Sequence, residues 1–143
     1  MPMKERYAMQ LDPTAFVAHP ALISVLEKKS TPVDCATDRV LFAQGDPPVG
    51  VYILESGAVR LTMESAEGEP IVSTKAPEGS LLGLPGLLGN QPYTLTATAE
   101  AGSQVGFIPR DEFTALMQNE PAVALQILAV LAAEVRSARR AIG

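Results

Sequence analysis

The fold is decided by residues 45–64, whose sequence is GDPPVGVYILESGAVRLTME. The run Val51–Leu54 is continuously apolar and ends at the turn Glu55-Ser56-Gly57. From Ala58 to Glu64, apolar and polar side chains alternate, which is typical of a strand with one face buried. Glycine suits the turn because a tight connection between strands favours residues that tolerate positive φ. The stretch therefore predicts two strands joined by a tight turn.

Short apolar runs between turns also lie on both sides of this stretch. Twelve prolines and eleven glycines in 143 residues indicate a protein with many turns and short strands. No low-complexity segment or long linker divides the chain, so its length fits one domain. We predict the further strands or extended segments at Val40–Phe42, Ile71–Thr74, Ser80–Gly83, Tyr93–Ala99 and Gln104–Ile108.

Helices are predicted before, within and after the strands. Asp12-Pro13 and Pro20 each predict the start of a short helix, because proline suits the first helical position. Leu84–Leu88 predicts one helical turn. Residues 110–143 are helical in pattern, with a break at Asn119-Glu120-Pro121.

The last helix carries an apolar seam whose members are spaced alternately four and three residues apart. This spacing favours contact with another helix, and we expect a parallel homodimer. The alternative is that the seam packs against strands of the same chain. Ile127 and Val130 point away from the seam, where they could pack on the strands instead. The seam consists of Ala124, Leu128, Leu131, Val135, Ala138 and Ile142.

Several segments together resemble the cyclic-nucleotide-binding domain family. Gly45-Asp46 and residues 51–61 resemble the first half of that domain, in which glycines punctuate apolar strands. Gly79–Gly83, followed by a helical turn, is similar to the phosphate-binding cassette of the family. Residues 107–113, a strand that leads into a helix, also match. Because several elements match in order over roughly residues 31–142, the resemblance is specific for the fold.

The resemblance implies a mainly β fold with flanking helices. The expected core is an eight-stranded double-stranded β-helix, or jelly-roll barrel, at residues 31–109. An N-terminal helical segment at residues 1–30 would precede it, and helices at residues 110–143 would follow and form the dimer contact. The family's transcription factors continue into a helix-turn-helix domain, whereas this chain stops at Gly143. We therefore expect a stand-alone regulatory domain that does not bind an operator directly.

The family's charged ligand contacts are replaced in this sequence. Members that bind cyclic AMP have a glutamate where this chain has Leu84, and an arginine where it has Tyr93 or Thr94. Residues 76–109 contain no lysine, arginine or histidine. A charge-assisted hydrogen bond contributes roughly 1.5–3 kcal/mol, so the missing arginine weakens binding about ten- to a hundredfold. Helix positions that contact the base in one branch correspond to Ala138 and Arg139. The sequence predicts no high-affinity binding of cyclic AMP or cyclic GMP.

Three functional hypotheses remain. The domain could sense an apolar or weakly anionic small molecule, could be an interaction or structural module with a collapsed site, or could bind a cyclic nucleotide through unusual contacts. The cassette leucines could line a pocket or fill it, and Tyr93 could contact a ligand or close the barrel mouth. The candidate ligand-binding residues are Leu82, Gly83, Leu84, Pro85, Gly86, Tyr93 and Thr94.

Composition and single residues disfavour several other classes of function. The net charge of −5 and the absence of a basic tract disfavour binding to nucleic acid. The polar start of the chain and the short apolar run Ile127–Ala133 indicate a cytoplasmic protein without a membrane span. Cys35 is the only cysteine and His19 the only histidine, so we expect structural roles for both. No catalytic set or metal-ligand cluster is found, and we expect neither enzyme activity nor a cofactor.

Overall fold

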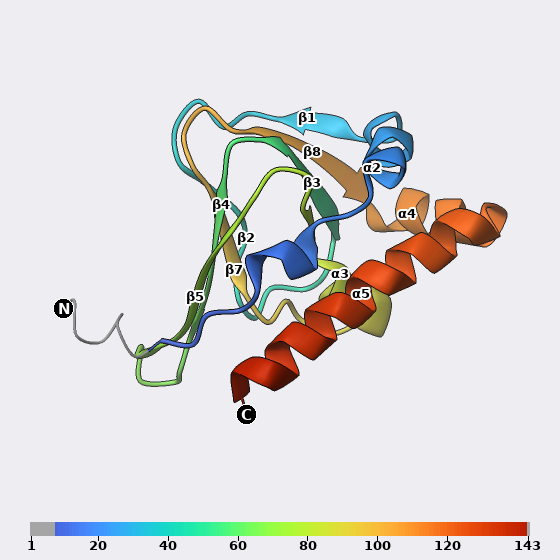
Figure 1. Ribbon diagram of the computed structural model, residues 1–143. Helices are drawn as coiled ribbons and strands as arrows, with labels where there is room; N and C mark the ends of the chain where they lie inside the picture. The colour runs from blue at the N-terminus through green and yellow to red at the C-terminus, as the bar shows by residue number, and fades with distance from the viewer. Residues whose placement is uncertain (1–7, 143) are drawn as a thin grey trace.

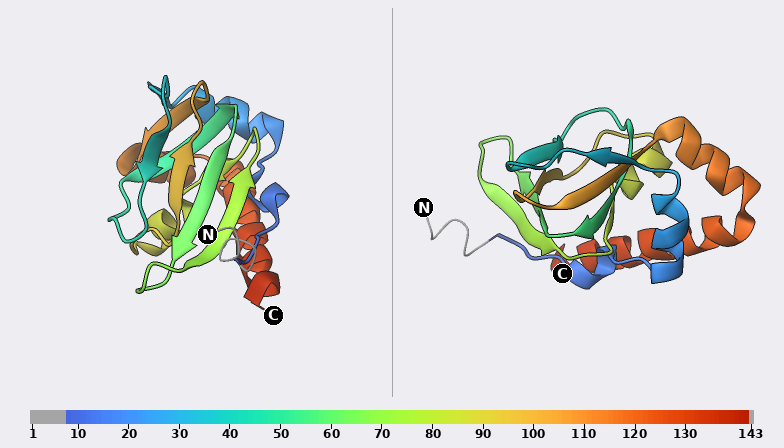
Figure 2. Two further views of the ribbon diagram at one scale, coloured as in Figure 1. Left: turned by 90° about the vertical axis from the view of Figure 1, so that its left-hand side faces the viewer. Right: turned by 90° about the horizontal axis from the view of Figure 1, so that it is seen from above.

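The computed structural model describes residues 8–142, apart from the side chain of Ile142. Its strands form two four-stranded antiparallel sheets that face each other as a barrel (Figures 1 and 2). The eight-stranded jelly-roll barrel with flanking helices is therefore confirmed. One sheet contains, in order, β1 (Thr31–Val33), β8 (Gln104–Pro109), β3 (Gly50–Ser56) and β6 (Leu81–Leu82). The other contains β2 (Arg39–Phe42), β7 (Thr96–Ala99), β4 (Val59–Glu64) and β5 (Pro70–Ala76).

The turn at Gly57 carries the chain from one sheet to the other. β3 pairs with β8 and β6, whereas β4 pairs with β5 and β7, so residues 45–64 supply a strand to each sheet. Gly57 has φ +96°, and an added Cβ would collide with Ser103. Any side chain there would meet both backbone strain and a steric clash. The glycine is therefore required by local geometry.

Two strands differ from the sequence prediction. β1 was not predicted, because it has only three residues and includes Pro32. It is formed by its partner, since Thr31 pairs with Phe107 and Val33 with Val105 on β8. The predicted strand Tyr93–Ala99 is too long, because β7 begins only at Thr96. The backbone of Tyr93 is instead bonded to the loop after β2, through Gly45 N–H and the Asp46 carbonyl.

The helices begin where proline predicted them. η1 (Pro13–Phe16) is a single 3-10 turn, and the Asp12 carboxylate accepts a hydrogen bond from Thr14 N–H at 3.0 Å. α2 (Pro20–Glu27) is capped by Nδ1 of His19, which accepts from Ala21 N–H at 3.1 Å. The remaining helices are α3 (Leu84–Gly89), α4 (Arg110–Asn119) and α5 (Pro121–Ile142). Figure 1 shows α5 running along the barrel beside η1.

Two hydrophobic clusters share β3 as a wall. Tyr52 and Leu54 point into the barrel cluster, which lies between the two sheets. Val51 and Ile53 point into a second cluster, which lies under α2, α4 and α5. Because successive side chains of a strand face opposite sides, a strand buried on both faces is continuously apolar. This explains the run Val51–Leu54, whose members are at most 8% exposed.

One face of α5 is buried, and the described residues of the predicted seam are partly exposed and partly half-buried. Ile127 (0% exposed) and Val130 (7%) pack in the second cluster, as expected. On the seam, Leu128 is 45% and Val135 46% exposed. The side chain of Ile142 lies outside the described residues, as do residues 1–7 and Gly143 of the predicted terminal segments. Among the described helices, only α5 is long and apolar enough (mean hydropathy 1.4) to cross a membrane. Length and composition alone are weak evidence for a membrane span, and α5 packs against the barrel.

Candidate functional site

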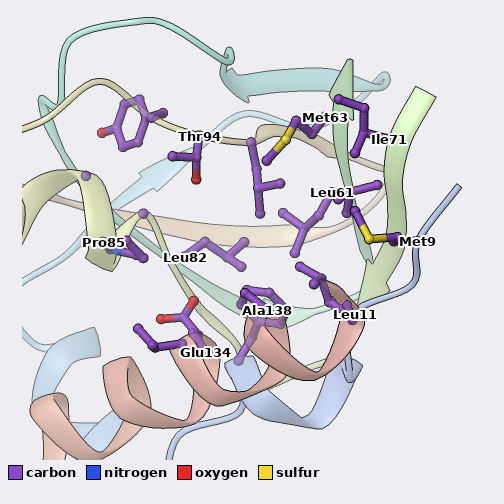
Figure 3. A pocket seen from close by; sticks show the side chains of 18 of the residues that line it. Met9, Leu11, Leu61, Met63, Ile71, Leu82, Pro85, Thr94, Glu134 and Ala138 are labelled. Carbon is purple, nitrogen blue, oxygen red and sulfur yellow. The ribbon is translucent and has the colours of Figure 1, made fainter. Parts of the chain in front are cut away.

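A cavity of about 440 Å³ lies inside the barrel and is covered by the C-terminal half of α5 (Figure 3). This volume is in the range of small-molecule sites. Its walls are mostly aliphatic, aromatic and methionine side chains, contributed by elements from both ends of the chain. The lining residues include Met9, Leu11, Phe16, Phe42, Leu61, Met63, Ile71, Val72, Leu82, Gly83, Pro85, Gly86, Tyr93, Thr94, Leu95, Glu134, Val135, Ala138, Arg139 and Ala141.

The cassette helix α3 separates this cavity from the second cluster. Pro85 and Gly86 line the cavity, together with Gly83 at the N-cap and Leu82 on β6. Leu84 does not, because its side chain is fully buried in the second cluster with Leu87. Of the two alternatives for the cassette leucines, Leu84 therefore fills the interior and does not line the cavity. Successive residues of a helix are about 100° apart around its axis, so Leu84 and Pro85 point in different directions.

Tyr93 contributes its ring to the cavity and its hydroxyl to the barrel. The ring stacks on Phe42 with centroids 4.1 Å apart. The hydroxyl donates to the Gly50 carbonyl at 2.7 Å and accepts from the N–H groups of Val49 (3.1 Å) and Gly50 (3.3 Å). These bonds use the donor and both acceptor sites of a phenol. The Tyr93 hydroxyl therefore anchors the start of β3.

Close packing around Tyr93 depends on a glycine of the cassette. Gly83 has φ +95°, and an added Cβ would lie 3.2 Å from Cε1 of Tyr93 and 3.3 Å from the Gly50 carbonyl oxygen. Both its conformation and its space therefore favour glycine. The backbone of Gly83 therefore packs closely against the Tyr93 ring.

The polar groups of the cavity are few and lie apart. Thr94 is exposed, and its hydroxyl points towards the cavity from the wall opposite α5 (Figure 3). Glu134 is only 7% exposed and points from α5 towards Leu82 and Pro85 (Figure 3). Burial raises the pKa of the Glu134 carboxyl well above its ordinary value. Arg139 is the one cation among the lining residues described, and it is exposed at the rim.

The sequence matches the cyclic nucleotide-binding domain family over residues 32–120, which is more than half of the chain. The chain belongs to this family. It is a cyclic nucleotide-binding domain of the regulator type and has the barrel fold of that family. Residues 79–94, where the resemblance places the cassette, carry no charged side chain.

Curated relatives and solved structures agree with this assignment. The chain is 27% identical over 117 residues to the CRP-like cAMP-activated global transcriptional regulator of Mycobacterium tuberculosis, covering 82% of this chain and 52% of the relative. It is 30% identical over 100 residues to the cyclic AMP receptor protein of Thermus thermophilus (70% and 46%). The crystal structure of Thermus thermophilus catabolite activator protein superposes with a TM-score of 0.73 at 24% identity (90% and 60%), which shows the shared fold. The domain spans about half the length of these curated relatives.

Apart from Ala138 and Arg139, sequence reasoning missed the lining residues contributed by the two ends of the domain. Met9 lies beside β5, where its N–H bonds the Ile71 carbonyl at 2.7 Å. Nothing local in its sequence signals this long-range pairing. Glu134 did carry a signal, since it lies four residues after Val130 on the buried face of α5. A charged residue at such a position indicates either a partner or a site.

The remaining singled-out residues have structural surroundings. His19 caps α2, in agreement with its predicted role at a helix start. Cys35 is buried, and desolvation raises the pKa of its thiol, which disfavours the reactive thiolate. Among the described residues, no group of three or more histidine, cysteine or acidic side chains could hold a metal ion.

Proposed function

We propose that this domain is a regulatory sensor whose barrel cavity takes a mainly apolar small molecule and binds cyclic AMP and cyclic GMP poorly. The observation that carries the proposal is the lining of the cavity. Its walls are hydrocarbon and methionine from both sheets, with one exposed cation at the rim and a carboxyl group inside. An apolar molecule gains free energy by leaving water for such walls, at about 25 cal/mol for each Å² buried.

The same cavity walls provide few favourable contacts for a cyclic phosphate. Its negative charge would lose water without gaining a cation, since residues 76–109 carry no basic side chain. Ionisation of Glu134 would add a like charge inside the cavity. The short helix α3 begins with Leu84 and Pro85, and the proline lacks an N–H donor. The balance therefore favours a ligand without a phosphate group.

The volume of the cavity supports a sensor over a collapsed module. A collapsed site would have its interior filled by cassette side chains, and Leu84 and Leu87 do fill the neighbouring cluster. The space beside Pro85 and Gly86 nevertheless stays open at about 440 Å³. Apolar cavities of this size are costly unless they bind something.

The signal would leave the cavity through α5. Ala138 and Val135 line the cavity, whereas Leu128 is exposed on the same helix. A ligand that contacts Ala138 can therefore shift how α5 lies on the barrel, provided that its affinity differs between the two positions. We propose that two copies pair through the exposed face of α5 in the cytoplasm, with neither nucleic acid nor a membrane as the domain's direct partner. A Leu128→Glu variant that leaves the mass in light scattering unchanged would contradict the pairing.

Calorimetric titration tests the proposed ligand class. Cyclic AMP and cyclic GMP should show no binding in the low-micromolar range, whereas a thermal-shift screen of apolar metabolites should raise the melting temperature. Low-micromolar affinity for either nucleotide would overturn the proposal. An Ala138→Leu variant, which narrows the cavity, should lose the thermal shifts and serves as the control for binding elsewhere.

A further inference from the structure

Glu134 is a buried carboxyl group with an unsatisfied oxygen. Its Oε2 atom has no hydrogen-bond partner, and it is the one buried side-chain polar atom of this kind among residues 8–142. The side chain is 7% exposed and points into the cavity (Figure 3). Buried polar groups without partners are rare in native proteins, and each requires an explanation.

No neighbouring side chain supplies the missing bond. Arg139 lies five positions further along α5, about 140° around the helix axis, and is exposed. Ala138, one turn from Glu134, has no polar group. The Ser137 hydroxyl accepts from Asp12 N–H at 2.7 Å, which holds the N-terminal segment on α5. The Tyr93 hydroxyl is occupied by the backbone of Val49 and Gly50.

We propose that Glu134 is the polar anchor of the ligand, which is an apolar molecule with a hydrogen-bond-donating head group, either an ammonium or a hydroxyl. This inference rests on the proposed function. The apolar body would contact the walls formed by Leu61, Met63 and Val72, and the head group would meet Oε2. A carboxylate head group is disfavoured, because two acidic groups would then face each other without a cation between them.

The two head groups differ in what happens to the proton of Glu134. Burial favours the neutral carboxylic acid in the empty cavity, so its pKa is raised. An ammonium ligand stabilises the carboxylate, and Glu134 then releases one proton to solvent as the ion pair forms. A hydroxyl ligand donates to the carbonyl oxygen or accepts from the acid, and no proton is released. Proton release on binding therefore distinguishes an ammonium head group from a hydroxyl head group.

The experiment uses octylamine, octanol and octanoate as probes that share one alkyl chain. Each is titrated calorimetrically into the wild-type chain in two buffers with different ionisation enthalpies, which reports proton release. Glu134→Leu should weaken octylamine or octanol binding roughly ten- to a hundredfold, since a buried acceptor is lost. Glu134→Gln, which keeps a neutral acceptor, should weaken octylamine and spare octanol. Glu112→Leu, at an exposed carboxylate on α4, is the matched control and should change neither.

Every outcome bears on the proposal. Octylamine binding with proton release, or octanol binding without it, supports the anchor and identifies the head group. Octanoate binding as tight as either, equal binding by wild type and Glu134→Leu, or no binding of octylamine and octanol overturns it. Low-micromolar binding of cyclic AMP would instead overturn the proposed function itself, so the two failures are distinguishable. Circular dichroism of each variant shows that it is folded.

Discussion

The two halves of α5 cover regions that differ in packing, one a filled hydrophobic cluster and the other an open cavity. Ile127 and Val130 pack into the second cluster, where Phe113 and Ile108 are fully buried and the helix contacts well-filled apolar walls. Glu134 and the residues after it cover an open cavity. One helix therefore spans a well-packed region and an incompletely packed one. The well-packed region supplies stability, and the incompletely packed region can therefore stay open for a ligand.

The largest effect should come from opening the packed region. We expect Phe113→Ala to reduce the free energy of unfolding by about 3–5 kcal/mol, because removing a fully buried ring leaves a cavity among close-packed neighbours. Urea denaturation followed by circular dichroism measures this loss. Met63→Ala, on the cavity wall, should cost less because Met63 is only half-buried and already borders empty space. Equal losses would show that the two interiors do not differ in packing.

The next largest effect should come from removing the Tyr93 hydroxyl, which holds the start of β3 beside the cavity. We expect Tyr93→Phe to reduce the free energy of unfolding by about 1–3 kcal/mol, because the Gly50 carbonyl and two N–H groups lose their common partner. Tyr52→Phe is the matched control in the same aromatic row, and should cost less. Chemical denaturation of both variants measures the difference. If the two losses are equal, the Tyr93 hydroxyl is not an anchor of β3.

The sequence predicted the parts of this fold that local pattern controls. Residues 45–64 fix two strands and their turn by themselves, because a continuous apolar run and an alternating one need only their own periodicity. β1 could not be predicted, since three residues with a proline form a strand only through pairing with β8. The start of β7 was placed too early because the bonds that hold Tyr93 in a loop come from Gly45 and Asp46.

The candidate ligand-binding residues came from the family resemblance, and all of them except Leu84 line the cavity. Their role in binding a ligand stays a prediction. Which side of a one-turn helix faces the cavity depends on tertiary packing, so the sequence left open whether Leu84 lines or fills the space. Glu134 was not predicted, because it is not part of the apolar seam of α5 and lies on the adjacent, buried face of the helix. Contacts of the ends of a chain are the least local, which is why Met9 gave no signal.

Stability of the open region should depend on pH through Glu134. Its pKa is raised by burial, so the folded state holds a proton that the unfolded state releases above the ordinary value of 4.5. The free energy of unfolding should therefore fall as pH rises from 4.5 to the raised pKa, and then level off. The other ionisable side chains that line the cavity are Tyr93 and Arg139.

Glu134→Gln tests this dependence, because it removes the titration at similar size. The variant should be more stable than wild type near neutral pH, and part of the pH dependence should disappear. Melting temperatures of both proteins, measured from about pH 5 upwards, show whether the difference between them grows as the pH rises. Glu112→Gln, at an exposed site, should leave the profile unchanged. Parallel profiles for Glu134→Gln and wild type would contradict a raised pKa of Glu134 in the folded state.

The smallest change in stability should come from filling the cavity. Ala138→Leu adds a branched side chain beside open volume, so the usual penalty for overpacking is offset by burial of the added methyl groups. We expect the free energy of unfolding to stay within about 1 kcal/mol of wild type, while binding of octylamine or octanol is lost. Ala129→Leu, at an exposed position of the same helix, controls for helix propensity and should bind normally. A large loss of stability in Ala138→Leu would mean that its neighbours have closed the cavity in solution. Stability retained together with lost binding would show that the space over Glu134 is kept for a ligand and is not needed for folding.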